Sequence, residues 1–582
     1  MKELSTEQRL LLALVLSVLV VTLSDLLFFR HPKSASSKQA TSQTMPASKT
    51  APPATAQAVA PQAAAVAPAA PAEQAGEPQI AATNEESVVV ESPVYRVVLS
   101  NRGAVVRSWQ LKRYGEESNP KRVLDVVHPP TNAQSDEWPL SLLLVDPQLQ
   151  AQANKALFQM KPGPATLHAP VTVDFRWSNG HLAITKQIEF GIGYVAQLRT
   201  SVTLNGQPVA YAVAWRGGFG DATVYHAADQ VQIFYATGGS VNALASKKLG
   251  TSDHPEVPTV AASAAQFAGI EDHYFAAAFL PAEGSVSAWD WRTERQSPGG
   301  AAGTQEPVAE IAVGSSETAP APVVVRLFVG PKSLKVLGQV DPKLRALVHY
   351  GIMGFIAEPL FYVLRYIHDY VPNWGWAIVL LTVVLNMALF PLKLSSWRSM
   401  QKMQKVMPEM KAIQARYKKY PMRDPRRQKM NEEMMALYQK EGVNPMGSCL
   451  PMLLQMPVWF ALYEMLEVAI ELRQAPWFGW IHDLSAHDPY YILPILMTIA
   501  GYGMQKMTPI TSPDPNQQRM MNFMPVIFGL LFFRLSSGLI LYIFTSYLIG
   551  ISQQWYLNKT SPVTAAASGA GAGKKVKRQA VE

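Results

Sequence analysis

One segment of this chain restricts the possible folds more than any other, because it is long and apolar yet carries groups that lipid does not accept. It runs from Val443 to Leu466, with the sequence VNPMGSCLPMLLQMPVWFALYEML. A turn around Pro445 leads into an apolar helix that holds Gln455 and two prolines, Pro451 and Pro457. Hydrocarbon leaves polar side chains and freed backbone groups unsatisfied, so these residues should face protein or a water-filled cavity. The segment therefore predicts a membrane protein with a polar, protein-lined space inside the bilayer.

The chain has several apolar stretches of about twenty residues or more, each long enough to cross the hydrocarbon. They run over Leu10–Phe29, Trp374–Leu394, Met446–Ile470, Tyr490–Met507 and Met520–Tyr556. The last stretch is too long for one helix, and Ser536-Ser537-Gly538 divides it into two spans joined by a tight turn. Leu10–Phe29 exceeds the usual apolar region of a signal peptide, and no Ala-x-Ala site directly follows it, so it is predicted to be an uncleaved anchor. We expect six spans in all.

The segment between the first and second spans is predicted to hold a linker and a soluble domain. Residues from Ser34 to about Gln79 are mostly Ala, Pro, Ser, Thr and Gln, a composition that predicts a disordered tether. From about Val88 to Val336, alternating strands flank turns such as Asn101-Arg102-Gly103, Asn179-Gly180 and Asn205-Gly206. These patterns predict an all-β domain of roughly 250 residues.

An amphipathic helix is predicted over Leu344–Tyr370. Flanking tryptophans and the span that follows at once favour a helix lying on the membrane surface over a helix buried in the β domain. Its apolar face is predicted to hold Phe355, Leu360, Phe361, Leu364 and Ile367.

The distribution of Lys and Arg predicts the orientation of the chain. Twelve of these residues lie between Leu394 and Pro445, whereas the loop Glu471–Pro489 has only Arg473. By the positive-inside rule the first segment is cytoplasmic and the second is exported. The basic tail, with Lys574 and Arg578, returns to the cytoplasm. Counting spans backwards places the β domain outside and the N-terminus inside.

The basic segment after the second span is predicted to be a helical hairpin that turns at Pro421–Pro425. Apolar residues recur at spacings of three and four. The methionines among them are Met400, Met403, Met407, Met410, Met430 and Met434. One interpretation is that this stripe holds the two helices together. The other is that methionine, which adapts to varied apolar partners, contacts incoming helices.

Polar side chains recur inside the predicted spans. They are Thr382, Asn386, Gln455, Thr545 and Ser546. Hydrogen bonding between helices explains any one of them. Taken together, they predict the polar wall of a groove that is open to cytoplasm and lipid.

Residues Arg473–Asp483 (RQAPWFGWIHD) and Leu484–Pro494 (LSAHDPYYILP), with Val443–Leu466, closely resemble the YidC insertase family, and the resemblance is dense over Leu347–Leu557. It implies a multi-domain bacterial inner-membrane protein with six transmembrane helices, namely an N-terminal anchor and a five-helix core. An exported β-supersandwich domain and a cytoplasmic helical hairpin complete this architecture. Such proteins insert nascent helical membrane proteins and act as chaperones for them. The implied partners are the Sec translocon, the translating ribosome, nascent membrane proteins and lipids.

The chain departs from the family at one groove position. The family typically carries an arginine shortly before a Pro-Leu motif, here Phe390-Pro391-Leu392, and this chain has Asn386 there. The groove is therefore expected to be polar but less positive. Arg534 is the only nearby candidate to compensate, and its place beside the outer turn favours a headgroup contact instead.

Other chemistry finds little support in the sequence. The single cysteine, Cys449, excludes an intramolecular disulfide, and no P-loop pattern occurs. His482-Asp483 and His487-Asp488 do not have a metal-ligand spacing, so no metal, cofactor or enzymatic activity is predicted. A membrane-anchored carbohydrate-binding or sugar-modifying protein that uses the β domain is the alternative. A small-solute transporter is a weaker one, because no inverted repeat is visible.

These inferences divide the chain into eight segments. They are an anchor (1–30), a linker (31–79), the β domain (80–343), an interfacial helix (344–372), the second span (373–394), the hairpin (395–445), the last four spans (446–557) and a basic tail (558–582).

Overall fold

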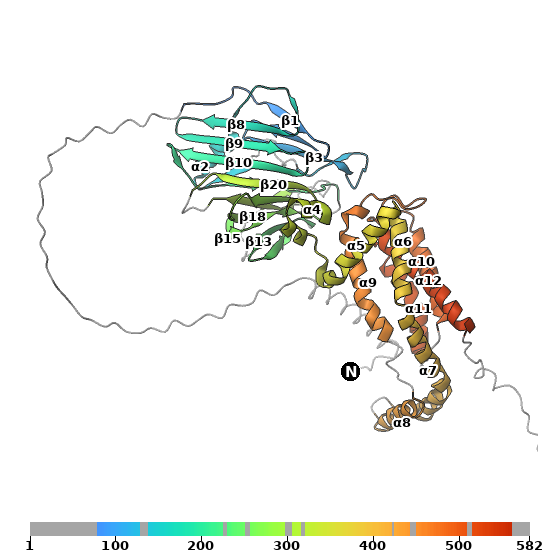
Figure 1. The fold of residues 1–582 in the computed structure, drawn as a ribbon. Helices are drawn as coiled ribbons and strands as arrows, with labels where there is room; N and C mark the ends of the chain where they lie inside the picture. The colour runs from blue at the N-terminus through green and yellow to red at the C-terminus, as the bar shows by residue number, and fades with distance from the viewer. Residues whose placement is uncertain are drawn as a thin grey trace, which may run out of the picture. The chain divides into compact units, whose positions relative to one another are not determined.

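The computed structural model describes residues 78–128, 138–224, 230–250, 257–296, 305–315, 320–421, 424–442, 450–508 and 515–560. The predicted anchor, nearly all of the linker, Cys449 and the basic tail after Thr560 lie outside these residues. The described residues lie in one compact unit, in which an all-β region precedes a helical region (Figure 1).

Three sheets make up the β domain. A ten-stranded sheet runs in the order β14 (Ser240–Ala245), β13 (Gln232–Thr237), β16 (Phe267–Glu271), β17 (Phe275–Pro281), β20 (Val323–Pro331), β10 (Val195–Leu204), β9 (Leu182–Phe190), β8 (Val171–Ser178) and β6 (Gln159–Met160), with β11 (Gln207–Pro208) beside β10. The first five-stranded sheet runs β4 (Val123–Asp125), β3 (Val105–Gly115), β2 (Tyr95–Ser100), β1 (Ser87–Glu91) and β7 (Thr166–His168). The second runs β15 (Thr259–Ala265), β18 (Val286–Gln296), β19 (Gln305–Gly314), β12 (Tyr211–Trp215) and β5 (Ser141–Leu144). The short helices α2 (Pro147–Lys155) and η1 (Ser246–Lys248) lie in connections.

The turns predicted from the sequence are confirmed. β2 and β3 flank Asn101-Arg102-Gly103, and β8 pairs with β9 in antiparallel register across Asn179-Gly180. β10 ends at Leu204 and pairs with β11 across Asn205-Gly206. Gly103, Gly180 and Gly206 all have positive φ, which explains why glycine follows asparagine or arginine at these tight turns.

A single cluster of buried apolar residues joins all three sheets. At its centre the rings of Tyr95, Trp109 and Phe190 lie 5.7–6.1 Å apart, and the Tyr95 hydroxyl donates to the Gly191 carbonyl at 2.6 Å. Alternate residues of β9 point inward, as a strand with one buried face requires. One of these inward residues is the charged Lys186.

Lys186 is fully buried, and backbone oxygens hold its amino group. Its Nζ donates to the carbonyls of Gly103, Ala104 and Leu140 at 2.7–3.1 Å. Three acceptors match the three N–H bonds of an ammonium group, so this lysine ties β9 to the turn before β3 and to the segment before β5. Burial lowers the pKa of Lys186 to about 7.

The connection from the β domain to the bundle consists of α4 (Leu334–Val340), η2 (Pro342–Leu347), η3 (Gly351–Met353) and α5 (Gly354–Tyr370). α5 packs against α6 and α9 through Ala357, Phe361 and Leu364. The predicted apolar face is wrong at Phe355, whose exposed fraction is 75%. Phe355 lies two residues before Ala357, which places it about 200° around the helix from the buried stripe.

The predicted second span is bent. α6 (Trp374–Ala388) ends near Leu389, and α7 (Phe390–Tyr417) starts at an angle of 53° to it. Pro391 accounts for the break, since proline disfavours helical backbone in the residue before it and is accepted in the first turn of a new helix. Within the described ranges no single helix is both long and apolar enough to cross a bilayer, whereas α6 and α7 meet that test as a bent pair.

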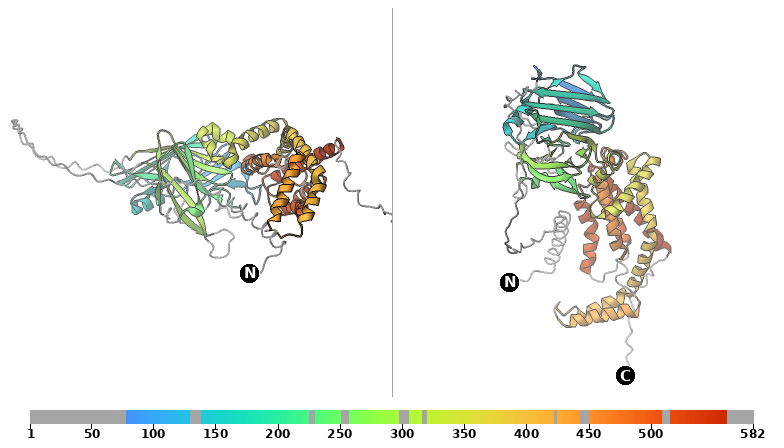
Figure 2. Two further views of the ribbon diagram at one scale, coloured as in Figure 1. Left: turned by 90° about the horizontal axis from the view of Figure 1, so that it is seen from below. Right: turned by 60° about the vertical axis from the view of Figure 1, so that its left-hand side comes forward.

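The remaining helices form the bundle with α6. They are α9 (Leu450–Val468), α10 (Ile492–Met507), α11 (Pro515–Leu531) and α12 (Ser537–Thr560), with η5 (Ile470–Leu472) after α9. α12 contacts α6, α9 and α10, and Figures 1 and 2 show these helices side by side. A Cβ atom at Gly501 would lie 3.0 Å from Tyr547, so glycine permits the close approach of α10 and α12. The predicted break at Ser536-Ser537-Gly538 is confirmed, because α12 begins at Ser537.

A separate apolar cluster joins α7 to α8 (Arg426–Lys440) in a helical hairpin. Met403 and Met410 are buried in it, and Met430 and Met434 pack against it from α8. Met407 is also buried, whereas Met400 is half-buried. Most of the methionine stripe therefore holds the hairpin together.

The buried Lys186 predicts a pH-dependent stability. Its pKa is lower in the folded domain, about 7, than the ordinary 10.5 of the unfolded chain, so the unfolded state binds more protons between these values. The free energy of unfolding of the β domain should therefore rise with pH above about 7, by at most about 1.4 kcal/mol per pH unit. Urea unfolding at several pH values measures this slope. Lys186→Met is the control that should remove it, and equal slopes in the two proteins would contradict the prediction.

Candidate functional site

A chain of polar side chains runs through the otherwise apolar contact between α6 and α12. Thr382 is fully buried on α6, and its hydroxyl donates to the Ile378 carbonyl at 2.6 Å. One turn later, Asn386 is 2% exposed, and its Nδ2 donates to the Thr382 carbonyl at 2.8 Å and to the Ser546 hydroxyl of α12 at 3.5 Å. The Asn386 amide therefore links two helices, and its oxygen remains available as an acceptor.

Lys393 occupies that acceptor. Its Nζ lies 2.7 Å from Oδ1 of Asn386 and 3.3 Å from Oε1 of Gln553 on α12. Gln553 in turn donates to the backbone oxygen of Asn386 at 3.4 Å. Both partners of the ammonium group are neutral amides, and the described residues include no carboxylate within 4.0 Å of it. Within the described residues, the site thus holds a lysine that two amides orient and that no carboxylate neutralises.

The bend between α6 and α7 brings this cation into the site. On a straight helix, seven residues would separate Lys393 from Asn386 by about 10 Å. The 53° bend at Leu389 and the long lysine side chain allow Nζ to reach back to the amide. A cation in the first turn of a helix is opposed by the helix dipole, so intrinsic helix stability does not explain its position there.

A second polar group lies one turn earlier on α12. The phenol of Tyr542 interacts with the side chains of Ser546 and Gln455, and the latter comes from α9. Ser546 is thus shared between Asn386 of α6 and Tyr542. Thr545, the next residue back along the helix, is 8% exposed.

The structure brings most of the predicted polar residues together. Thr382, Asn386 and Ser546 are linked directly, and Tyr542 connects Gln455 to them. Sequence reasoning missed Lys393, Gln553 and Tyr542. The signal for Lys393 was its place two residues after Pro391, a proline that predicts a bend. Arg534, which had been considered as the compensating cation, is exposed, and Lys393 is the cation beside Asn386.

The two acidic residues of the His-Asp pairs have local structural partners. Asp483 accepts from the backbone and hydroxyl of Ser485 at 2.8 and 2.7 Å. Asp488 accepts from Trp480 Nε1 at 3.0 Å and from the Leu493 backbone at 2.7 Å, at the start of α10. In the described part of the chain, no group of three or more His, Cys, Asp or Glu residues could hold a metal ion.

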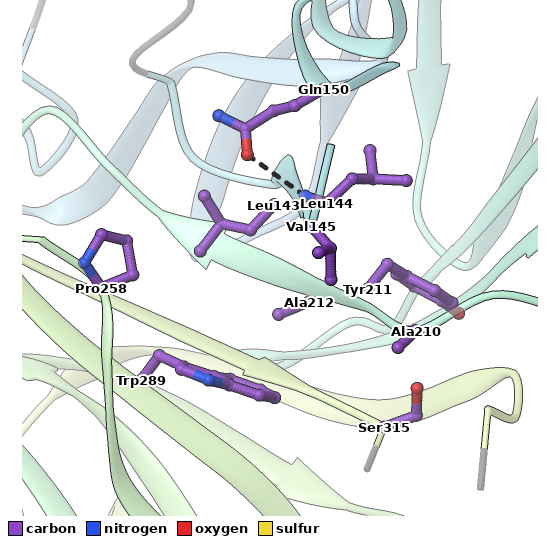
Figure 3. A pocket seen from close by; sticks show the side chains of 10 residues that line it. All are labelled: Leu143, Leu144, Val145, Gln150, Ala210, Tyr211, Ala212, Pro258, Trp289 and Ser315. Atoms are coloured by element: carbon purple, nitrogen blue, oxygen red, sulfur yellow. Dashed lines mark hydrogen bonds between the residues drawn. The ribbon is translucent and has the colours of Figure 1, made fainter. Parts of the chain in front are cut away.

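The β domain has a hollow of about 260 Å³ beside β5, β12 and β18, which Figure 3 shows. Its lining residues are Leu143, Leu144, Val145, Gln150, Ala210, Tyr211, Ala212, Pro258, Trp289 and Ser315. These side chains include no carboxylate or imidazole. The Tyr211 hydroxyl donates to the Thr200 carbonyl and accepts from the Val323 N–H. The Gln150 side chain accepts from the Leu144 N–H at 3.1 Å. The hollow therefore lacks the acid–base pair that a sugar-modifying enzyme would need.

The fold and the buried polar contact define a class of protein, a helical bundle with a polar interior and an appended β domain. Two family descriptions match it: residues 87–363 match the YidC periplasmic domain, and residues 366–564 match the 60Kd inner membrane protein family.

Curated relatives named membrane protein insertase YidC include one from Cupriavidus necator, 35% identical over 503 residues that cover 83% of this chain and 84% of the relative. Another, from Burkholderia multivorans, is 44% identical over 288 residues, covering 49% of this chain and 50% of the relative. A crystal structure titled as an active YidC insertase with its first transmembrane domain resolved is 17% identical, covers 83% of this chain and 95% of that one, and has a TM-score of 0.35.

The chain belongs to the YidC family of membrane protein insertases. It is an inner-membrane protein with a periplasmic domain, and its function is membrane protein insertion. The sugar-modifying alternative is not supported.

Proposed function

We propose that this insertase carries the hydrophilic ends of nascent membrane proteins part-way across the bilayer through the groove formed by Thr382, Asn386, Gln455, Thr545 and Ser546. The observation that carries the proposal is the buried polar chain between α6 and α12, which ends at an ammonium group held by two neutral amides. Polar walls lower the cost of moving a short hydrophilic segment, while the apolar segment beside it partitions into lipid. No nucleotide is required for this process.

Lys393 selects among substrates in this mechanism. A positive group held by two neutral amides attracts carboxylates more strongly than neutral side chains, because the surrounding helices exclude much of the solvent that would screen the charge. Asn386 and Gln553 position the ammonium group, so the asparagine functions together with the lysine. Substrates with acidic exported ends should therefore be captured faster than neutral ones.

The α7–α8 hairpin receives substrates at the cytoplasmic mouth. Met400 and the exposed Met435 are available for contact, whereas Met403, Met407, Met410, Met430 and Met434 reach a substrate only if the hairpin opens. The basic residues of the hairpin and of the tail suit the translating ribosome and anionic lipid. We assign the Sec translocon as a further partner on the strength of the family resemblance.

We also propose six spans with both termini in the cytoplasm and the β domain in the periplasm. The first span is the anchor Leu10–Phe29. The other five are α6 with the start of α7, α9, α10, α11 and α12. The lysine and arginine distribution supports this arrangement.

The proposed topology predicts where fused reporters are active. After Gly206, only a reporter that requires an exported location should be active. After Pro421, only a reporter that requires the cytoplasm should be active. Alkaline phosphatase and a cytoplasm-dependent fluorescent protein at both sites provide the measurement. Activities opposite to these at both sites would reverse the orientation.

Deletion of Met400–Leu437 should abolish insertion, because the substrate would lose its first contact surface. The bundle should remain folded, since the hairpin has its own apolar cluster. Protease protection of a substrate in vesicles measures insertion, and thermal unfolding in detergent measures the bundle. Met403→Leu, which nearly conserves volume, is the control and should cost little. Normal insertion by the deletion protein would make the hairpin a spacer.

The groove cation gives the sharpest test of the proposal. Lys393→Gln keeps hydrogen bonding but removes the charge, and it should lower the ratio of insertion rates of acidic-ended to neutral-ended substrates by about tenfold, equivalent to one charged hydrogen bond of about 1.4 kcal/mol. The substrates should form a matched pair that differs only by Glu→Gln in the exported end. The double variant Asn386→Arg/Lys393→Gln returns a cation to the site and should restore the ratio.

Lys402→Gln is a matched control, because this exposed lysine lies on the same helix but outside the groove. It should leave the ratio of the two rates unchanged. If Lys393→Gln also leaves the ratio unchanged, charge does not govern capture and the groove works by hydration alone.

A further inference from the structure

The ten-stranded sheet of the β domain carries a further hollow on the face of β8, β9 and β10 that points away from the core. Its volume is about 720 Å³. A smaller hollow of about 310 Å³, beside β6 and β8, shares Asp174 and Arg176 with it. Alternate residues of β8, β9 and β10 are buried, so the exposed ones between them form the floor. We call the two connected hollows the sheet groove.

Two arginines flank the central strand of the sheet groove. Arg176 of β8 is paired with Thr185 of β9, and Arg199 of β10 is paired with Gln187 of β9. Thr185 and Gln187 point to the same face, and directly paired residues lie about 5 Å apart, so both guanidinium groups can reach a group that lies over β9. Both arginines are exposed, and among the described residues no carboxylate lies within 4.0 Å of either guanidinium group. The two charges are therefore available to a ligand.

The floor between the arginines consists of neutral groups that form hydrogen bonds. The hydroxyls of Thr185 and Ser201 share a hydrogen bond of 2.6 Å, and Nε2 of Gln187 donates to Oδ1 of Asp174 at 2.9 Å. These bonds hold the floor side chains in place before a ligand arrives. Guanidinium groups form charge-assisted hydrogen bonds with carboxylates and with phosphates, so the floor and its two arginines suit an oxyanion of either kind.

Two features of the sheet groove favour a peptide carboxylate over a phosphate chain. Asp174 places a negative charge in the groove, which repels a ligand whose charges are closely spaced but tolerates single carboxylates that avoid it. A carboxylate oxygen also accepts hydrogen bonds from the backbone N–H groups that a peptide offers. The rim includes the apolar residues Ile80, Pro322 and Val324, which suit the apolar side chains beside an acidic residue.

We propose that the sheet groove binds an extended peptide segment of another protein in the periplasm, in which acidic and apolar side chains alternate. One carboxylate of this segment lies over Thr185 and Gln187, between Arg176 and Arg199. A neighbouring apolar side chain contacts Ile80 at the rim. This binding site goes beyond the proposed insertase function, because none of its residues lies in the helical bundle and insertion does not depend on it.

Peptide binding to the full chain in lipid nanodiscs provides the test. The probe is a fluorescent peptide of alternating Glu and Val, and its matched control has Gln in place of Glu. Fluorescence anisotropy should show that the acidic peptide binds about tenfold more tightly than the Gln peptide, the effect of one charged hydrogen bond. Arg176→Gln and Arg199→Gln should each remove about tenfold of the affinity for the acidic peptide.

Arg326→Gln is the matched control, because it removes the same charge from the same sheet outside the groove. Arg326 lies on β20, and its guanidinium is 3.6 Å from the carboxylate of Asp341. This variant should bind the acidic peptide as the wild-type chain does, and thermal unfolding should show that all three arginine variants remain folded. Asp174→Asn removes the repulsive charge and should raise the affinity for long-chain polyphosphate by about threefold.

Three results would overturn the proposed peptide site. Equal binding of the acidic and Gln peptides would show that the groove does not recognise carboxylates. An equal loss of affinity in Arg326→Gln and Arg176→Gln would reduce the effect to the net charge of the domain. Tighter binding of polyphosphate than of the acidic peptide by the wild-type chain would make the groove a phosphate site instead.

Discussion

The burial of Asn386 between α6 and α12 is the contact on which the arrangement of α6, α7 and α12 depends. An amide in an apolar contact must find partners, and here it finds Thr382 behind it, Ser546 across from it and Lys393 from the next helix. These partners fix the rotation of α6 against α12 and the direction in which α7 departs. Because each partner is itself polar, the Asn386 amide has hydrogen-bond partners although it is almost fully buried.

The bend at Leu389 and the amide of Asn386 lie next to each other, and the Asn386 amide binds the lysine that follows the bend. The family resemblance led us to expect a less positive groove, because asparagine occupies the position of the usual arginine. That expectation treated the helix as straight and compared charges position by position. The bend before Pro391 turns α7 so that a lysine seven residues away reaches the same amide. In this chain Lys393, held beside Asn386, thus supplies the charge that position 386 lacks.

Much of the fold was predictable from the sequence, for identifiable reasons. Asn-Gly and Arg-Gly turns need positive φ, so the hairpins at residues 101–103, 179–180 and 205–206 follow from local chemistry. The break at Ser536 follows from length and turn residues. Phe355 was assigned to the wrong face of α5, because apolarity alone does not say which side chains of a helix pack against its neighbours. An exposed aromatic side chain is acceptable on a helix at a membrane surface. The burial of Lys186 and Arg473 was not predicted, because long-range partners decide whether a charge is buried.

The two ends of the bundle differ in how firmly they are held, and this asymmetry suits an insertase. At residues 469–491, between α9 and α10, Ile470 lies in the core cluster of the β domain and Arg473 forms a buried ion pair with Asp221 of that domain. At the opposite end, α6 gives way to a bent continuation, and the hairpin beyond it has its own small cluster. Structural change requires the least loss of packing where clusters are small and separate. The hairpin end can therefore change its packing at a lower cost than the end that packs on the β domain.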